Sequence, residues 1–195
     1  MVKEPSEASK TLGVRAAPDG NLVAHLAHMK KCGLDWGDKL HTTYLPRRLV
    51  WRSHDMQLYP QVSYGLECLL ATPMELSKEM KTVIRHCLSP LGVNQNIKSE
   101  FATTSHKYQG ISLPDWTAEK LAKDVNVLFR HWGLPTAVGK LLCHSYELLQ
   151  METGLQGNIF ARSFSSFGCL ASHSWMKILW QYARKLKVSI LLVDC

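Results

Sequence analysis

Carboxylate side chains are considered first, because paired carboxylates can hold the divalent cations that assist phosphoryl transfer. Such sites commonly use two adjacent aspartates that project into one place. The 195-residue chain contains sixteen Asp and Glu residues, but no Asp-Asp pair occurs, and the acids are scattered over segments with helical spacing. We therefore expect no two-metal site, no cofactor and no catalytic residue in this chain.

Thiols and imidazoles are the next candidates for chemistry. They come close in sequence at three places, which are His86-Cys87, Cys143-His144 and Cys169 with His173. Adjacent residues on a helix point about 100° apart and do not usually chelate one ion, and no Cys-x-x-Cys pair is present. Only the Cys169-x-x-x-His173 spacing would let both side chains act at one point. An unrecognised enzyme that uses this loop is therefore a third hypothesis. Buried thiols and surface imidazoles are the simpler interpretation, and we predict no metal.

Basic side chains give the positive signal. The chain has 23 Lys and Arg residues and a formal net charge of +7. Residues 30–52 contain six Lys and Arg residues, and the candidates for phosphate binding are five of them, Lys30, Lys31, Arg47, Arg48 and Arg52. Such side chains bind the backbone phosphates of a nucleic-acid duplex without reading its sequence. The alternative is that they only solvate helix faces, which makes the chain a helical interaction protein or scaffold with incidental positive charge.

Two predicted helices carry these basic residues. Apolar side chains recur at helical spacing over residues 22–43, which predicts the first helix. Pro46 is suited to the first position of the second helix, and Tyr59-Pro60 is expected to end it. On this second helix Arg48 and Arg52 are one turn apart and share a face. Gly33 and Gly37 weaken the first helix by about 1 kcal/mol each, unless a neighbouring helix packs closely there.

Cap residues mark the elements that follow. Thr72-Pro73-Met74-Glu75 is a capping box that begins a helix over residues 73–88. Residues 90–114 are predicted to be irregular, with a short strand or turn at Tyr108-Gln109-Gly110-Ile111. Asp115 is expected to cap a helix that ends at Gly133.

Thr136 is expected to cap a helix that ends near Gly154, with these side chains inside: Val138, Leu141, Leu142, Leu148 and Leu149. Residues 155–172 are predicted to form a loop, Ser174 to cap a last helix, and Val188–Val193 to be able to form a short strand. The helical spacing of four tryptophans favours the core over base stacking, and these are Trp36, Trp51, Trp132 and Trp180.

The N-terminal segment connects these elements to a known family. Leu12 and Val14 alternate with small or polar residues in Lys10-Thr11-Leu12-Gly13-Val14-Arg15, as in a half-buried strand, and Pro18-Asp19-Gly20-Asn21 follows as a turn and helix cap. This order of strand, turn and helix resembles the post-palm region of retrotransposon reverse transcriptases of the non-LTR-like kind. The resemblance continues through Tyr108-Gln109-Gly110-Ile111 and Trp175-Met176-Lys177-Ile178-Leu179-Trp180 and spans most of the chain.

The resemblance implies a mainly α-helical thumb and connection region with a short N-terminal β element. It implies that Leu12, Gly13 and Val14 form a strand near the primer terminus, and that the five basic side chains hold the template-primer duplex, RNA-DNA or DNA. Since the family's paired palm aspartates have no counterpart here, it also implies a non-catalytic fragment that begins after the palm. A palm-containing portion of a reverse transcriptase is then an expected partner.

Domain organisation follows from the same signals. We predict a disordered segment at 1–9, a strand plus thumb-like helices at 10–89, an irregular connector at 90–114 and a helical region at 115–195. Six widely spaced cysteines with no signal peptide ahead of them indicate reduced thiols and an intracellular protein, in nucleus or cytoplasm. No run approaches the roughly 20 apolar residues of a membrane span, so no membrane partner is expected.

Overall fold

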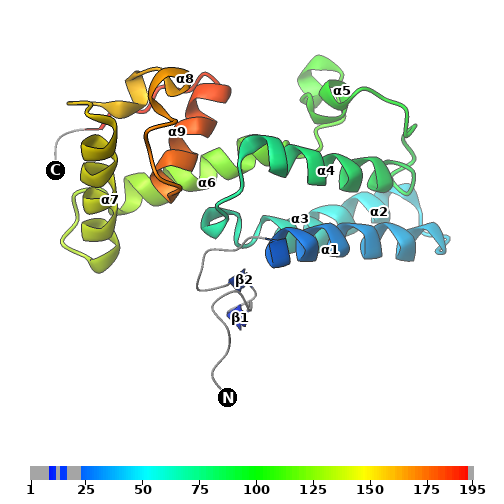
Figure 1. Cartoon of the computed structure of the whole chain (residues 1–195). Coiled ribbons are helices and arrows are strands. Elements are labelled where there is room, and N and C mark those ends of the chain that lie inside the picture. The colour runs from blue at the N-terminus through cyan, green and yellow to red at the C-terminus, as the bar shows by residue number, and fades with distance from the viewer. Residues whose placement is uncertain (1–8, 12–13, 17–22, 193–195) are drawn as a thin grey trace. The chain divides into compact units, whose positions relative to one another are not determined.

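The computed structural model describes residues 9–11, 14–16 and 23–192, and within them the chain is mainly helical (Figure 1). This confirms the predicted fold class, mainly α with a short N-terminal β element. The α-helices are α1 (Val23–His41), α2 (Arg47–Ser53), α3 (Tyr59–Ser63), α4 (Pro73–Leu88), α5 (Ser99–Thr103), α6 (Trp116–His131), α7 (Ala137–Thr153), α8 (Phe164–Phe167) and α9 (Trp175–Lys185). Short 3₁₀ turns lie at Leu66–Cys68, His106–Tyr108 and Ile159–Ala161.

The chain divides into two compact units. The first contains the described residues up to Leu69 together with Met74–Glu119, and the second contains Leu70–Pro73 and the described residues from Lys120 onward. In the first unit, α1 packs against α4, where Gly33 lies directly against the buried side chain of Val83. In the second unit, α9 supplies the centre of the core, because Trp180 and Tyr182 are fully buried.

Strand structure among the described residues is limited to β1 (Ser9–Thr11) and β2 (Val14–Ala16). The two strands pair in antiparallel register, with Thr11 opposite Val14. The prediction of a single strand through residues 10–15 is therefore wrong, because the chain reverses between these partners. Leu12 and Gly13, the predicted turn at Pro18-Asp19-Gly20-Asn21 and residues 1–8 lie outside the described residues. Of the segment 1–9 that was predicted to be disordered, Ser9 belongs to β1 because it pairs with Ala16.

The helix that follows Pro46 is longer than predicted. Pro46 is the N-cap of α2 rather than its first residue, and Pro60 does not end the helix, which continues as α3 to Ser63. A π-helical segment, His54–Leu58, joins α2 to α3, and the amide of Tyr59 donates to the carbonyl of His54. The extra residue in this turn accommodates a proline that lacks an N–H and would clash with a regular preceding turn.

Most of the predicted helix starts are confirmed. Asp115 Oδ1 accepts hydrogen bonds from the amide nitrogen and the hydroxyl of Thr117, at 3.0 and 2.6 Å. Thr136 caps α7 through the amide of Gly139, and Ser174 caps α9 through the amide of Lys177. His106–Tyr108 form a 3₁₀ helix and Gln109 continues it as a turn, so of the strand or turn predicted for Tyr108-Gln109-Gly110-Ile111 the turn is confirmed.

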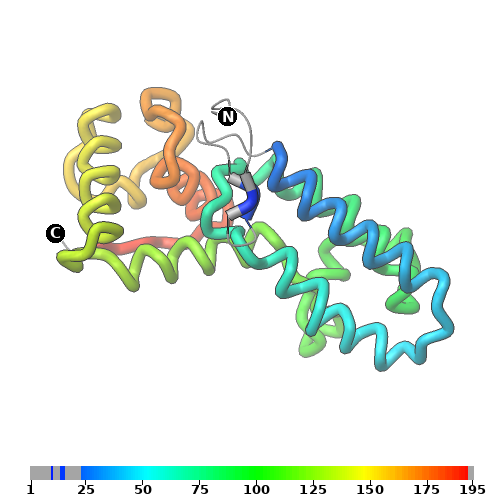
Figure 2. The backbone as a smooth tube through the Cα atoms, turned by 90° about the horizontal axis from the view of Figure 1, so that it is seen from below, coloured from blue at the N-terminus to red at the C-terminus, as the bar shows by residue number. Residues whose placement is uncertain are grey.

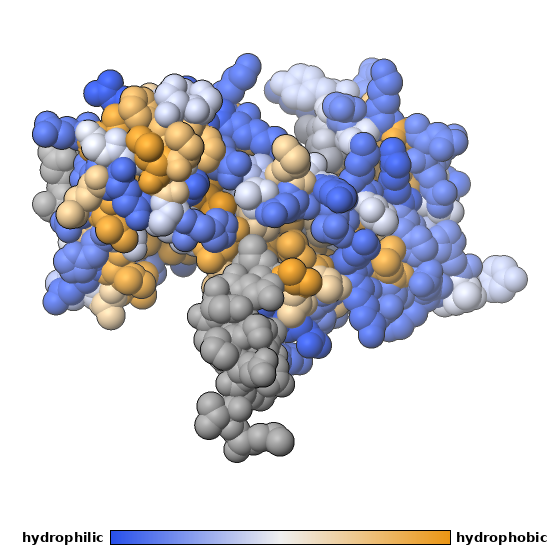
Figure 3. Space-filling view, viewed as in Figure 1, coloured by the Kyte–Doolittle hydropathy of each residue, from blue (hydrophilic) through white to orange (hydrophobic). Residues whose placement is uncertain are grey.

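The interior face predicted for α7 is only partly correct. Leu142 and Leu149 are buried, but Val138, Leu141 and Leu148 are 44%, 66% and 53% exposed. Apolar spacing alone could not decide this, because α7 is apolar on more than one face and packs in the second unit mainly against α9. The face of the molecule drawn in Figure 3 accordingly carries more apolar surface over the second unit than over the first.

The predicted C-terminal strand is also wrong within the described residues. Residues 188–192 form no strand, since no neighbouring strand is there to pair with them. The carbonyl of Ile190 instead accepts a hydrogen bond from the side-chain amide of Asn158, at 2.7 Å, and the Ile190 side chain is buried. Among the described helices, none has the length and apolar character that crossing a bilayer requires.

Candidate nucleic-acid interface

The five predicted phosphate-binding residues all belong to the first unit and come from α1 and α2. Figure 2 shows α1 beside the α2–α3 rod, with the two joined at one end by the loop of residues 42–46. Trp36 on α1 links the two elements, because its indole N–H donates to the Ser53 hydroxyl at 3.1 Å and its ring meets His54 edge-on. Val50 of α2 and His54 and Leu58 of the π-helical segment are buried at a spacing of four residues, so the continuous helix that they share has a fixed rotation.

Arg48 and Arg52 lie on the solvent side of α2. Both side chains are exposed, and neither has a carboxylate within salt-bridge distance among the described residues. One helical turn separates them, about 6 Å along the axis. Because Val50 of α2 and His54 and Leu58 of the following π-helical segment are buried, the backbone under the two arginines has a fixed orientation and presents both side chains to solvent.

The two lysines of α1 differ in their surroundings. Lys30 Nζ lies 3.0 Å from Glu79 Oε2 of α4, and its side chain is 38% exposed. This pair neutralises much of the Lys30 charge, although exposed ion pairs of this kind are weak and are screened by salt. Lys31 is exposed and makes no salt bridge among the described residues. Of the two, Lys31 is therefore the better placed to meet a phosphate.

Arg47 is held against the turn that follows α4. A side chain at Gly92 would collide with the Arg47 guanidinium, and Gly92 has a positive φ of 75° that favours glycine. Lys30 contacts α4 at Glu79, whereas Arg47 lies beyond its last residue, Leu88. Glu79 and Leu88 are about 14 Å apart along the helix, so the five residues form a dispersed basic surface rather than one tight cluster.

The predicted primer-proximal strand is described only at Val14. This residue is half-buried in β2, and a side chain at Gly65 would collide with Val14 and His25. The amide of Arg15 donates to His25 Nδ1 at 3.3 Å. These contacts hold the β hairpin against α1 and Gly65. Leu12 and Gly13 lie outside the described residues, so their predicted role stays a prediction.

The acids that have identified contacts serve local structural roles. Asp38 Oδ1 lies 2.8 Å from His86 Nε2, and Glu119 Oε2 accepts a hydrogen bond from the Tyr59 hydroxyl at 2.8 Å. Asp115 caps α6. Burial of the ring, followed by the hydrogen bond to Glu119, raises the pKa of Tyr59 to about 12. Asp38 belongs to α1, whereas Asp115 and Glu119 both lie at the start of α6, and among the described residues no three acids, histidines or cysteines gather into a possible metal site.

The cysteines in the described part of the chain do not gather with other reactive side chains into a candidate site. Burial raises the pKa of the Cys87 thiol to about 12, and burial followed by the nearby Asp35 charge raises the pKa of Cys32. Cys169 and His173 are both exposed, and no group of three potential metal ligands is present among the residues that the structure describes. The predicted role of this loop in an enzyme stays untested.

The tryptophans lie in or beside the cores of the two units. Trp36 and Trp180 are buried, and Trp51 and Trp132 are half-buried. Trp180 donates its indole N–H to the carbonyl of Arg162 at 3.2 Å and packs edge-on against Phe164. A packed and hydrogen-bonded indole is a structural element, which agrees with the preference for the core.

Sequence reasoning missed a second basic group in the first unit. Lys81 and Arg85 of α4 and Lys98 line a hollow on the side of α4 away from Gly33. The available signal was the four-residue spacing of Lys81 and Arg85 on the face opposite the buried Val83. The hollow itself could not be foreseen, because α5 and the start of α6 complete it.

Comparison of the chain with models of protein families, with characterised proteins and with solved structures finds no match.

Proposed function

We propose that this chain binds nucleic-acid duplex, RNA-DNA or DNA, through its backbone phosphates, as the thumb and connection region of a retroelement reverse transcriptase does. On this proposal the chain catalyses no nucleotide incorporation itself and acts together with a palm-containing polymerase portion. The observation that carries the proposal is the exposed Arg48 and Arg52 pair on a rotationally fixed helix.

The charge arrangement favours binding without sequence readout. Arg48, Arg52 and Lys31 are exposed and make no salt bridge among the described residues, whereas Lys30 is paired and Arg47 packs against a turn. Exposed cations neutralise phosphates and release counterions, which gives affinity for any sequence and a dependence on salt. The dispersed surface has no element that presents several side chains to base edges in a groove.

The absence of catalysis is proposed on the arrangement of the acids. The sequence has no Asp-Asp pair, and the carboxylates of Asp38, Glu119 and Asp115 are occupied by partners on their own or neighbouring elements. A two-metal centre needs several carboxylates free to bind cations at one place.

A salt titration tests the proposal. Three phosphate contacts predict a slope of log K against log salt of about −2.7, at about −0.9 for each contact. Replacing Arg48 and Arg52 together by Ala is expected to reduce the magnitude of this slope by about 1.8, because two of the contacts are lost. Fluorescence anisotropy with a labelled RNA-DNA hybrid measures both the affinity and the slope.

The control removes the same charge elsewhere. Arg130 and Arg184 are exposed arginines of the second unit, and their joint replacement by Ala is expected to leave the slope unchanged. Circular dichroism verifies that both double variants keep their helical content. If the Arg48 and Arg52 variant binds the hybrid with unaltered affinity and slope, the proposal fails.

A helical interaction protein is the second candidate function, and one observation favours it. Val138, Leu141, Leu148 and Met151 form an exposed apolar stripe along α7, with exposures from 44% to 79%. Exposed apolar surface of this kind can mark a site of protein association. Absence of hybrid binding by the native chain at low salt would make this candidate the better one.

A further inference from the structure

Helix α7, in the second unit, has two faces that both follow the heptad spacing of a coiled coil. The inner face is buried, and its residues are alternately three and four positions apart: Gly139, Leu142, Tyr146, Leu149 and Thr153. The outer face is exposed, and its residues are alternately four and three positions apart: Ala137, Leu141, His144, Leu148 and Met151. Such spacing aligns side chains in one stripe that can face a partner helix. We call the outer stripe the α7 seam.

Tyr146 fixes which face of α7 points outward. Its hydroxyl donates a hydrogen bond to the carbonyl of Gly157 at 2.9 Å and accepts one from the amide of Ile159 at 3.0 Å. Its ring stacks on Phe160 and meets Trp132 edge-on. Because α7 is anchored to its own unit through this side, it cannot turn the α7 seam inward. Apolar surface that is held outward in this way is typical of a protein association site.

Two residues of opposite charge flank the α7 seam. Lys140 and Glu147 each come directly before a leucine of the seam, a position whose charges form ion pairs between the helices of a coiled coil. About 10.5 Å of helix axis separates the two residues, so they cannot pair within one chain. Lys140 is exposed and makes no salt bridge among the described residues. Glu147 Oε2 lies 3.3 Å from His144 Nδ1, and exposed pairs of this kind contribute little.

A second copy of the chain complements this pattern when its α7 runs antiparallel. A two-fold axis at the centre of the α7 seam sets Leu141 against the partner's Leu148. The same axis sets Lys140 against the partner's Glu147, and the symmetry repeats both contacts. An in-register parallel arrangement would instead bring Glu147 of each copy beside the partner's Glu152, where like charges repel. The charges therefore favour the antiparallel pair.

His144 lies at the centre of the α7 seam and specifies the register. In the antiparallel pair it meets the partner's His144, whereas a shift by one helical turn would set its imidazole against the partner's Leu148. We propose that the chain forms a homodimer through antiparallel α7 helices. This proposal does not rest on duplex binding. The seam is only about 21 Å long, and small interfaces are typical of weak, reversible complexes, so we expect a dissociation constant of about 10 to 100 μM.

Sedimentation velocity of the full chain tests the proposal. The species at about 1 μM should have the 22.1 kDa mass of one chain, and at about 500 μM most of the protein should have twice that mass. Lys140→Glu and Glu147→Lys each place like charges against one another, so each alone should raise the dissociation constant at least about tenfold. An equimolar mixture of the two variants should recover the native constant, because one copy then contributes two acids and the other two bases.

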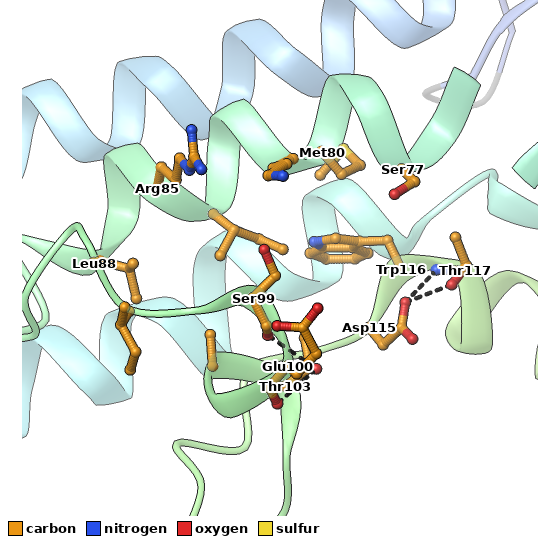
Figure 4. Close-up of a pocket in the computed structure, with 14 residues that line it drawn as sticks. Ser77, Met80, Arg85, Leu88, Ser99, Glu100, Thr103, Asp115, Trp116 and Thr117 are labelled. Atoms are coloured by element: carbon orange, nitrogen blue, oxygen red, sulfur yellow. Dashed lines mark hydrogen bonds between the residues drawn. The ribbon is translucent and has the colours of Figure 1, made fainter. Parts of the chain in front are cut away.

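Matched controls separate the α7 seam from the rest of the surface. Leu141→Ser with Leu148→Ser removes the central apolar contacts and should leave the chain monomeric. Leu170 and Leu191 are 57% and 75% exposed and lie outside α7 in the same unit, so their joint replacement by Ser should leave the dimer intact. Lys81 is an exposed lysine of the first unit and lines the hollow beside α4 (Figure 4), so Lys81→Glu should leave the dissociation constant unchanged.

The outcomes also distinguish this proposal from duplex binding. The Arg48 and Arg52 double variant should dimerise as the native chain does, so a failure of duplex binding leaves the dimer unaffected. Three results would each overturn the dimer: a native chain that stays monomeric at about 500 μM, an unchanged dissociation constant for Lys140→Glu, or no recovery in its mixture with Glu147→Lys. The helical content of each variant is verified by circular dichroism.

Discussion

Gly33→Ala is expected to destabilise the first unit, although alanine is the better helix former. Gly33 lies in the interior of α1, where alanine would contribute about 1 kcal/mol of helix stability relative to glycine. A methyl group at this position collides with Val83 Cγ1 of α4. Val83 is 2% exposed and β-branched, so it has little freedom to move aside.

The magnitude follows from these two opposing effects. Overpacking of a close core contact costs about 1 to 3 kcal/mol. Subtracting the helix gain of about 1 kcal/mol leaves a net loss in the free energy of unfolding of about 1 kcal/mol, within a range of zero to two. The carbonyl of Gly33 also accepts a weak hydrogen bond from the Cys87 thiol at 3.8 Å, which indicates how closely α1 and α4 approach here.

A double-mutant cycle with Val83→Ala isolates the collision. In the Val83→Ala background the obstructing methyl groups are absent, so Gly33→Ala should change sign and stabilise by about 1 kcal/mol. The expected coupling between the two positions is therefore about 2 kcal/mol, which is within the range measured for contacting residues. Urea unfolding followed by circular dichroism supplies the four free energies.

Gly37→Ala serves as a matched comparison one turn further along α1. The added methyl group meets the ring of His86, whose side chain is half-buried and joined to Asp38. A ring at the end of a side chain can rotate away, so this substitution should cost less than Gly33→Ala. If Gly33→Ala stabilises the otherwise native chain, the close packing of α1 against α4 is refuted.

Two further predictions concern buried ionisable groups. Burial first, and then the positive charges of His28 and Arg15, lower the pKa of His25 below its usual 6.5. The unfolded chain therefore binds a proton at this histidine more readily than the folded chain, so the free energy of unfolding should be highest above pH 6.5 and should decline as the pH falls below it. His25→Gln should flatten the urea midpoint between pH 7 and pH 5, and an unaltered pH profile would contradict this assignment. Lys120 Nζ and Asp124 Oδ2 are 2.6 Å apart and fully buried, so Lys120→Met should cost about 3 to 5 kcal/mol in thermal unfolding, whereas Lys120→Met with Asp124→Leu should be much closer to native.

Helix starts were predictable because a cap is a local interaction. The hydroxyl or carboxylate of Asp115, Thr136 and Ser174 reaches an amide only two or three residues along the chain. Such a contact depends on residue type and spacing, which the sequence displays directly. The phosphate-binding residues were proposed on similar local grounds, since Arg48 and Arg52 are one turn apart on a helix whose existence was predicted.

Features that depend on distant partners could not be predicted in this way. The continuation of the helix through Pro60 depends on a π-helical turn that no common sequence signal marks. The side chains of Lys120 and Asp124 resemble an exposed i,i+4 pair in sequence, yet both are buried, and the Lys120 ammonium lies 5.5 Å from the centre of the Tyr182 ring. Only the tertiary fold of the second unit decides that this pair faces inward.

The close packing of α1 against α4 forms the framework of the first unit, and its contribution can be measured apart from that of the charges on the surface. The face that bears Val83 needs a neighbour without side chains, and Gly33 provides it on α1. The same close contact fixes the rotation of α4, so Lys81 and Arg85 lie on its opposite side and line the hollow there. A substitution that disturbs the glycine contact should therefore lower both the stability of the first unit and its affinity for duplex, whereas the replacement of Arg48 and Arg52 should weaken duplex binding and leave stability nearly unchanged. That pattern would distinguish loss of the α1–α4 framework from loss of the phosphate contacts alone.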